Sequence, residues 1–151
     1  MANNPTAALP SLTIVRRLKA SPARVYAAFI EPETILKWWG PDTGPTLIAE
    51  TDVRPGGRFR VVFRTVDGEQ HENRGTYLEV VQDRKLVFTW EWVSLREPES
   101  RVTVLIAPLN TGTELTIVHE QFFDQAIRDS HEWGWGGTID KLNALLNDQR
   151  G

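Results

Sequence analysis

The hydrophobic pattern of this chain changes its period once, and that change limits the folds open to it. Between residues 46 and 119, apolar and polar side chains alternate in short runs separated by turns, whereas between residues 124 and 146 apolar residues recur every three or four positions. The first pattern is typical of strands with one buried face, and the second of an amphipathic helix. A sheet with one apolar face needs a cover, and the last segment is the only predicted helix long enough to provide it. We therefore expect an α+β fold in which a curved antiparallel sheet packs against one long C-terminal helix.

Two shorter helices are predicted near the N-terminus, after a first strand at residues 12–18. Ser21-Pro22 marks a helix start, because serine caps the first turn and proline suits the first helical position. A second start at Glu31-Pro32 leads to a short helix. Gly40-Pro41 ends that helix, since glycine accepts the left-handed conformation and proline cannot continue the helix.

Short turns such as Asp67-Gly68 separate six further predicted strands. These strands are expected at residues 46–53, 58–66, 71–81, 86–92, 102–106 and 115–119. The predicted order of elements is therefore β-α-α-β(6)-α. With 151 residues and no internal repeat, the chain is expected to form a single domain over residues 11–151 after a flexible leader at residues 1–10.

The composition argues against several classes of function. The formal net charge is −3, so a basic nucleic-acid-binding surface is not expected. The chain has no cysteine, which excludes disulfides, thiolate metal sites and cysteine nucleophiles. No apolar run approaches the roughly 18 residues of a membrane span, and the first ten residues lack the features of a signal peptide. A cytoplasmic location is expected.

The six tryptophans form three close pairs, Trp38/Trp39, Trp90/Trp92 and Trp133/Trp135. Tryptophan is large and stiff, so six in a small domain indicate either an aromatic-lined cleft or a core filled by rings. On the predicted last helix, Trp133 lies about 200° around the axis from Trp135 and is expected at the periphery. The same helix contains Gly134, Gly136 and Gly137, which favour close approach of a backbone, a bulky side chain or a ligand, or a bend in the helix.

Two of the three histidines are predicted to point inward. His119 alternates with buried positions of the last strand, and His131 shares the apolar face of the last helix, whereas His71 near a hairpin is expected to be more exposed. A neutral imidazole can orient a ligand or transfer protons, or it can simply be a hydrogen-bonded core residue. His131-Glu132 begins like a zinc-binding His-Glu-x-x-His motif, but the fifth position is Trp135, so neither a metal site nor a cofactor is expected.

Several motifs in chain order resemble one protein superfamily. They are Ala20-Ser21-Pro22, Glu31-Pro32-Glu33 running into Trp38-Trp39-Gly40-Pro41, Val53-Arg54-Pro55-Gly56-Gly57, Asp67-Gly68, Gly75-Thr76-Tyr77, Gly112-Thr113-Glu114 and Gly134-Trp135. Over residues 11–148 the chain resembles the SRPBCC superfamily, whose helix-grip fold is shared by START domains and birch-pollen-type allergens. Within it, the chain is most similar to stand-alone bacterial members of the family named after the activator of the heat-shock protein 90 ATPase.

The resemblance implies a deep cavity between the C-terminal helix and the sheet, where many superfamily members hold lipids, hydroxylated aromatics or other apolar ligands. The residues expected to line it are Trp38, Trp39, Phe59, Phe63, Phe88, Trp90, Trp92, His119, His131 and Trp135. Because one fold hosts many functions, three hypotheses stand. The first is a non-enzymatic binder of a small hydrophobic ligand. A role of such binding in a stress response is one option within this hypothesis.

The second hypothesis is a module that regulates a chaperone through protein contacts, which would need an exposed apolar patch. The third is a cyclase or hydrolase-like enzyme in which His119, His131 and an acid such as Glu120 transfer protons. The sequence favours the binder over the enzyme. It leaves open the ligand, the protein partner and the formation of a homodimer.

Overall fold

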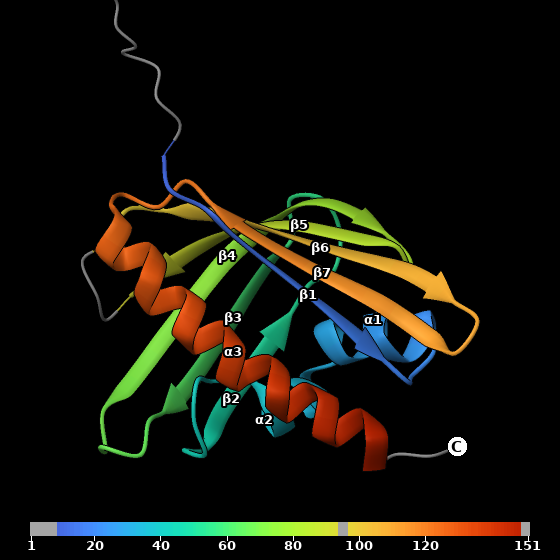
Figure 1. The fold of residues 1–151 in the computed structure, drawn as a ribbon. Coiled ribbons are helices and arrows are strands. Elements are labelled where there is room, and N and C mark those ends of the chain that lie inside the picture. Colours follow the sequence, from blue (N-terminus) through green and yellow to red (C-terminus); the bar gives the residue numbers. More distant parts are fainter. Residues whose placement is uncertain (1–8, 94–96, 149–151) are drawn as a thin grey trace, which may run out of the picture.

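The computed structural model describes residues 9–93 and 97–148 (Figure 1). The leader expected at residues 1–10 lies outside these ranges except for its last two residues. In the described part, seven antiparallel strands form one sheet with the order β1-β7-β6-β5-β4-β3-β2. The elements are β1 (Leu12–Leu18), α1 (Pro22–Ile30), α2 (Pro32–Trp38), β2 (Thr46–Thr51), β3 (Arg58–Arg64), β4 (Gln70–Val81), β5 (Lys85–Trp92), β6 (Ser100–Leu109), β7 (Gly112–Glu120) and α3 (Gln125–Asp148).

This order confirms the predicted β-α-α-β(6)-α arrangement. The strands from β2 to β7 follow one another as an antiparallel meander, and β1 pairs with the last of them. Figure 1 shows α3 crossing one face of the curved sheet, with α1 and α2 beside its C-terminal half. The long helix therefore covers the sheet face that the alternating pattern leaves apolar.

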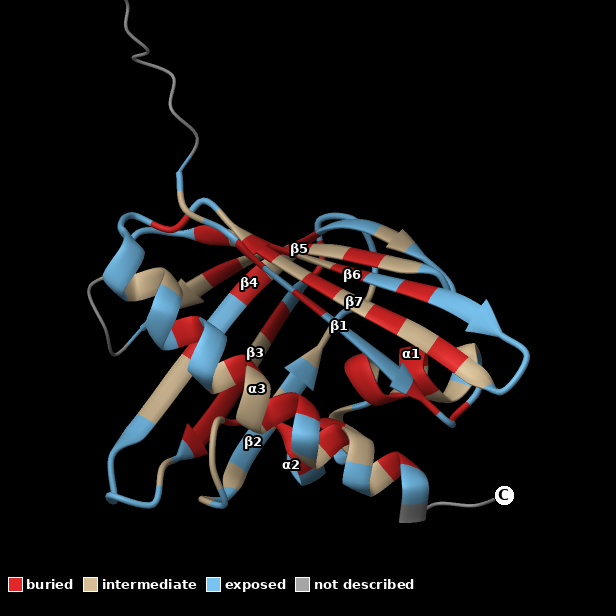
Figure 2. Cartoon of the chain, viewed as in Figure 1, coloured by how far each residue is buried: buried red, intermediate tan, exposed pale blue. Residues whose placement is uncertain are grey.

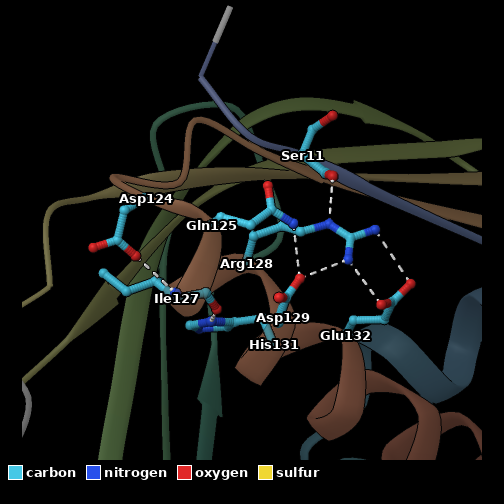
Figure 3. Close-up of polar contacts among 8 residues, drawn as sticks. All are labelled: Ser11, Asp124, Gln125, Ile127, Arg128, Asp129, His131 and Glu132. Atoms are coloured by element: carbon cyan, nitrogen blue, oxygen red, sulfur yellow. Dashed lines mark hydrogen bonds and ion pairs between the residues drawn. The ribbon is translucent and has the colours of Figure 1, made fainter.

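The helix starts follow the expected capping chemistry. The Ser21 hydroxyl accepts the backbone N–H of Arg24 at 3.3 Å, and proline occupies the first position of α1. At the start of α3, a carboxylate oxygen of Asp124 accepts the N–H of Ile127 at 2.9 Å (Figure 3). Both contacts satisfy backbone donors that a helix start leaves unpaired.

One strand is longer than its sequence suggests. We expect a turn from Pro108 onward, yet β6 continues through Pro108 to Leu109, and Pro108 lies opposite Thr113 of β7. The pairing of β6 with β5 ends at Leu105, so the other edge of β6 is free at Pro108. A proline on a free edge removes no ladder hydrogen bond, which is why the strand tolerates it.

The core lies between the inward face of the sheet and the helices. Figure 2 shows buried and more exposed positions alternating along the strands, and buried positions on the side of α3 that faces the sheet. On β5, Leu86, Phe88 and Trp90 are buried, as the alternation predicts. On α3, Ile139 and Leu142 are almost fully buried against this face. Within the described residues, no helix combines the length and the apolar character needed to cross a membrane.

Candidate functional site

A cavity of about 200 Å³ lies between the N-terminal half of α3 and the sheet. Its walls come from β3, β4 and β5, from the segment after α2, from Glu97 and from the stretch of α3 between Ser130 and Thr138. Five of the six tryptophans of the chain line it, together with Phe63. The cavity is therefore an aromatic-walled space.

The aromatic walls hold one another in place. Trp90 stacks on Trp39 with ring centroids 5.8 Å apart and planes 22° apart. The Trp90 ring also meets Trp92 edge-on at 5.6 Å and Trp135 at 5.5 Å. Such contacts stabilise aromatic pairs beyond simple burial, so these rings support one another in the wall of the cavity.

The other half of the space between the sheet and the helices is filled. Phe59 meets Phe88 edge-on at 5.1 Å, and Tyr77 lies 5.7 Å from Phe59. The free volume left among these rings, Phe29 and Ile35 is only about 10 Å³. This region is a close-packed core with no room for a ligand.

His119 lies behind the wall and is fully buried. Its Nδ1 accepts the indole N–H of Trp135 at 3.0 Å, and its Nε2 faces the Ser100 hydroxyl at 2.7 Å. Burial, with a smaller contribution from the nearby His131, lowers the pKa of His119 well below its usual value near 6.5. The ring is therefore neutral, and it positions Trp135 without facing the cavity.

His131 faces the cavity from α3. Its Nδ1 lies 2.9 Å from the carbonyl oxygen of Ile127 (Figure 3), and its Nε2 accepts the indole N–H of Trp92 at 3.1 Å. A carboxylate oxygen of Glu97, which also lines the cavity, lies 3.6 Å from the same Nε2. His131 and Glu97 thus form the polar part of a largely aromatic lining.

Polar contacts anchor the N-terminal half of α3. The Arg128 guanidinium donates to the Ser11 carbonyl oxygen at 2.9 Å and to the Glu132 carboxylate at 2.8 Å (Figure 3). The first contact joins α3 to the residue before β1, and the second lies along the helix. Together they fix the turn of α3 that presents His131 to the cavity.

The segment after α2 is held tightly against α3. The Lys141 ammonium donates to the carbonyl oxygens of Trp39 at 3.1 Å and Asp42 at 2.6 Å, and burial lowers the pKa of Lys141. The Thr138 hydroxyl contacts the carbonyl oxygen of Gly40 at 2.9 Å. A Cβ at Gly137 would collide with the carbonyl oxygen of Pro41, so this glycine permits the close approach of the backbone.

Two buried donors near the stacked Trp39–Trp90 pair have no acceptor among the described residues. They are the Trp90 indole N–H and the Asn73 side-chain amide. The Asn73 oxygen, in contrast, accepts the indole N–H of Trp39 at 3.0 Å. Asn73 is fully buried and fixes the ring that forms one wall of the cavity.

Six of the ten residues expected at the cavity line it. They are Trp39, Phe63, Trp90, Trp92, His131 and Trp135. Phe59 and Phe88 lie in the filled core, and His119 lies behind Trp135. Trp38 is also core, with its indole N–H donating to the Ala28 carbonyl oxygen at 2.9 Å.

Sequence reasoning missed nine residues of the described lining, and three of them, Trp133, His71 and Glu97, add an aromatic or ionisable side chain. Trp133 is 69% exposed, in keeping with a peripheral position, yet it lies at the edge of the cavity beside Ser130 and Gly134. His71 is half-buried, and its ring lies 5.6 Å from Phe63. Glu97 follows β5 in a segment without periodicity, so no pattern indicated its direction. The spacing of residues 130, 133 and 134 on one helix was the available signal for Trp133.

Glu120, named as a candidate acid, pairs with Arg101 at 3.3 Å and does not line the cavity. No group of three or more metal-binding side chains converges within residues 9–93 and 97–148.

The chain matches the family described as Activator of Hsp90 ATPase homolog 1-like protein over residues 19–147. Comparison with curated proteins finds no match. Among solved structures, protein CV1439 from Chromobacterium violaceum is 32% identical, with a TM-score of 0.83 over 90% of this chain and 96% of that chain.

Two further bacterial structures are similar along nearly their whole length. Protein NE0264 from Nitrosomonas europaea is 28% identical with a TM-score of 0.78, over 91% of this chain and 94% of that chain. The AHSA1 protein SPO3351 from Silicibacter pomeroyi is 25% identical with a TM-score of 0.82, over 93% and 100% of the two chains. These structures have the same helix-grip fold.

Proposed function

This chain belongs to the family of Activator of Hsp90 ATPase homolog 1-like proteins, and from that premise we propose that it binds a small hydrophobic ligand in the cavity beneath α3. Proteins of this superfamily commonly bind hydrophobic ligands. The observation that carries the proposal is the free volume of about 200 Å³ walled by five tryptophans and Phe63. A core that existed only for stability would be filled, as the neighbouring region around Phe59 and Phe88 is.

The volume sets the size of the ligand. An apolar protein cavity of about 150 Å³ stays dry and binds benzene. A cavity of about 200 Å³ therefore suits one aromatic ring with a short substituent, or an alkyl chain of similar size. A whole lipid would leave most of its apolar surface in water, so the proposal favours the aromatic class over the lipid class.

Tryptophan fluorescence provides the test, because most of the indoles of this chain line the cavity. We expect 2-phenylethanol, a neutral one-ring probe, to change the emission in a saturable way. For a ligand of this size we expect a Kd between about 10 µM and 1 mM.

Two glycines of α3 offer a matched pair of variants. Gly134 lines the cavity, and a Cβ there would meet the Cβ of Pro41 at an ordinary 3.7 Å, so Gly134→Leu should fold and fill part of the space. Gly136 lies two residues further along the helix, does not line the cavity and has open space around it, so Gly136→Leu is the control. We expect Gly134→Leu to abolish binding and Gly136→Leu to bind as the wild type does. Equal binding by both folded variants would contradict a site in this cavity.

A further inference from the structure

The described lining of the cavity contains an acidic side chain but no lysine or arginine. Among the described Asp, Glu, Lys and Arg residues, only Glu97 lines it. Lys141 lies behind the same wall without lining the cavity, and its ammonium group donates to two backbone carbonyl oxygens. Among the described residues, a ligand in the cavity therefore meets one carboxylate and no lysine or arginine side chain.

The Glu97 carboxylate is poorly satisfied where it stands. Its side chain is only 21% exposed, and no described residue donates a hydrogen bond to it. Among the described residues, its ion-pair neighbour is His131, whose Nε2 lies 3.6 Å from one carboxylate oxygen. Burial raises the pKa of Glu97 above its usual value, while the nearby His131 acts in the opposite direction and Asp124 adds to the increase.

The tautomer of His131 explains why this neighbour does not satisfy Glu97. Nδ1 faces the Ile127 carbonyl oxygen and must donate to it, while Nε2 accepts the indole N–H of Trp92. In the neutral ring, Nε2 therefore carries a lone pair and has no proton to offer. Two acceptors, Nε2 and the Glu97 oxygen, face each other, and a donor from outside the protein would satisfy the carboxylate.

The remaining walls favour a positive donor. The aromatic rings that line the cavity carry negative electrostatic potential on their faces, and tryptophan attracts cations more strongly than other aromatic residues do. An ammonium group also forms a stronger hydrogen bond with a carboxylate than a neutral hydroxyl does. A carboxylate ligand of the same shape would be repelled by Glu97.

We infer that the ligand of this cavity is a small organic cation, a one-ring or alkyl amine protonated at neutral pH, whose apolar body lies among the tryptophans and whose ammonium group donates to Glu97. This inference rests on the proposed function and narrows it to a class of ligand. Glu97 acts as the specificity-determining residue, and the aromatic walls contribute affinity that is shared by charged and neutral ligands.

Three probes of nearly equal size separate these contributions. They are 2-phenylethylammonium, 2-phenylethanol and phenylacetate, titrated at pH 7.5 by tryptophan fluorescence. We expect the wild-type protein to bind the ammonium probe about tenfold or more tighter than the alcohol, because a hydrogen bond to a charged group is worth that much. Phenylacetate should bind most weakly.

Glu97→Gln tests the named carboxylate. We expect this variant to lose the preference for the ammonium probe over 2-phenylethanol, because its neutral amide offers no negative charge to the ammonium group. Glu33→Gln, on the exposed surface of the first turn of α2, is the matched control and should keep the preference. Retention of the preference by Glu97→Gln would overturn the inference.

The wild-type titrations decide the question without any substitution. Equal affinity for the ammonium and alcohol probes, or tighter binding of phenylacetate, overturns the organic-cation inference and leaves the hydrophobic-ligand proposal standing. If none of the three probes gives a saturable change, both the inference and the proposed function fail.

Discussion

The indole N–H of Trp135 donates a hydrogen bond to Nδ1 of His119 across 3.0 Å. Nδ1 therefore carries the lone pair, and the proton of the neutral ring lies on Nε2, which faces the Ser100 hydroxyl at 2.7 Å. A histidine in this tautomer donates to serine and cannot take its proton. The Ser100–His119 pair thus lacks the arrangement of nucleophile and base that a serine hydrolase requires, although its distance alone resembles one.

The buried His119 predicts a loss of stability in acid. The unfolded chain takes up a proton at this residue near pH 6.5, while the folded protein resists it because its His119 pKa is much lower. Below pH 6.5 the unfolded state therefore binds more protons, and the free energy of unfolding falls as the pH falls, by up to about 1.4 kcal/mol per pH unit. Above pH 6.5 this contribution is constant.

Urea unfolding between pH 5 and pH 8 checks this expectation. His119→Gln keeps an acceptor for Trp135 and a donor for Ser100 but removes the titrating group. We expect a smaller slope of stability against pH in this variant. Identical slopes for wild type and variant would show that His119 does not titrate as described.

The stacked pair Trp39 and Trp90 predicts unequal costs for the same substitution. Both rings are buried, but only the N–H of Trp39 has an acceptor, the Asn73 oxygen at 3.0 Å. Trp39→Phe leaves that oxygen unpaired, whereas Trp90→Phe removes a donor that has no acceptor among the described residues. We expect Trp39→Phe to lower the free energy of unfolding by about 1–3 kcal/mol more than Trp90→Phe does.

Denaturant titrations of the two variants measure this difference directly. The comparison corrects for the loss of ring area, because each variant exchanges one indole for one phenyl group. An equal or larger loss for Trp90→Phe would contradict the assigned role of the Asn73 contact.

The glycines of α3 predict opposite effects of alanine. Gly136 has open space around it, so Gly136→Ala should raise the free energy of unfolding by about 0.8–1 kcal/mol through helix propensity alone. Gly137→Ala should lower it, because the added Cβ would collide with the Pro41 carbonyl oxygen and push the segment after α2 away from α3. Thermal unfolding of both variants provides the measurement. Stabilisation by both substitutions would show that Pro41 and α3 are not held at this distance.

Much of the fold could be predicted from local patterns. The alternation along β5 correctly placed Leu86, Phe88 and Trp90 on the buried face, because neighbouring side chains of a strand must point to opposite sides. Ser21-Pro22 correctly marked the start of α1, since capping depends on residues close in sequence. The end of β6 was wrong by several residues, because a proline is tolerated wherever the neighbouring strand has ended, and pairing between strands is not a local property.

The candidate site could be predicted only in part. The patterns identified Trp90, Trp92 and Trp135 as inward-facing residues, and these three lie on its walls. They could not separate these residues from Phe59 and Phe88, which face the same side of the sheet but fill a solid core. Glu97 was missed altogether, since the direction of a side chain in an irregular segment depends on what the segment packs against.

The sequence by itself determined which side chains turn inward and that one long helix must cover them. Both follow from the fixed spacing at which side chains return to the same face of a strand or a helix. Only the tertiary structure decided where the interior is filled and where it is hollow. A cavity is a small difference between the enclosed volume and the volume of the side chains, and the enclosed volume depends on how closely the elements approach. Here that distance is set by contacts such as that of Gly137 with Pro41, between residues about 100 positions apart in the chain.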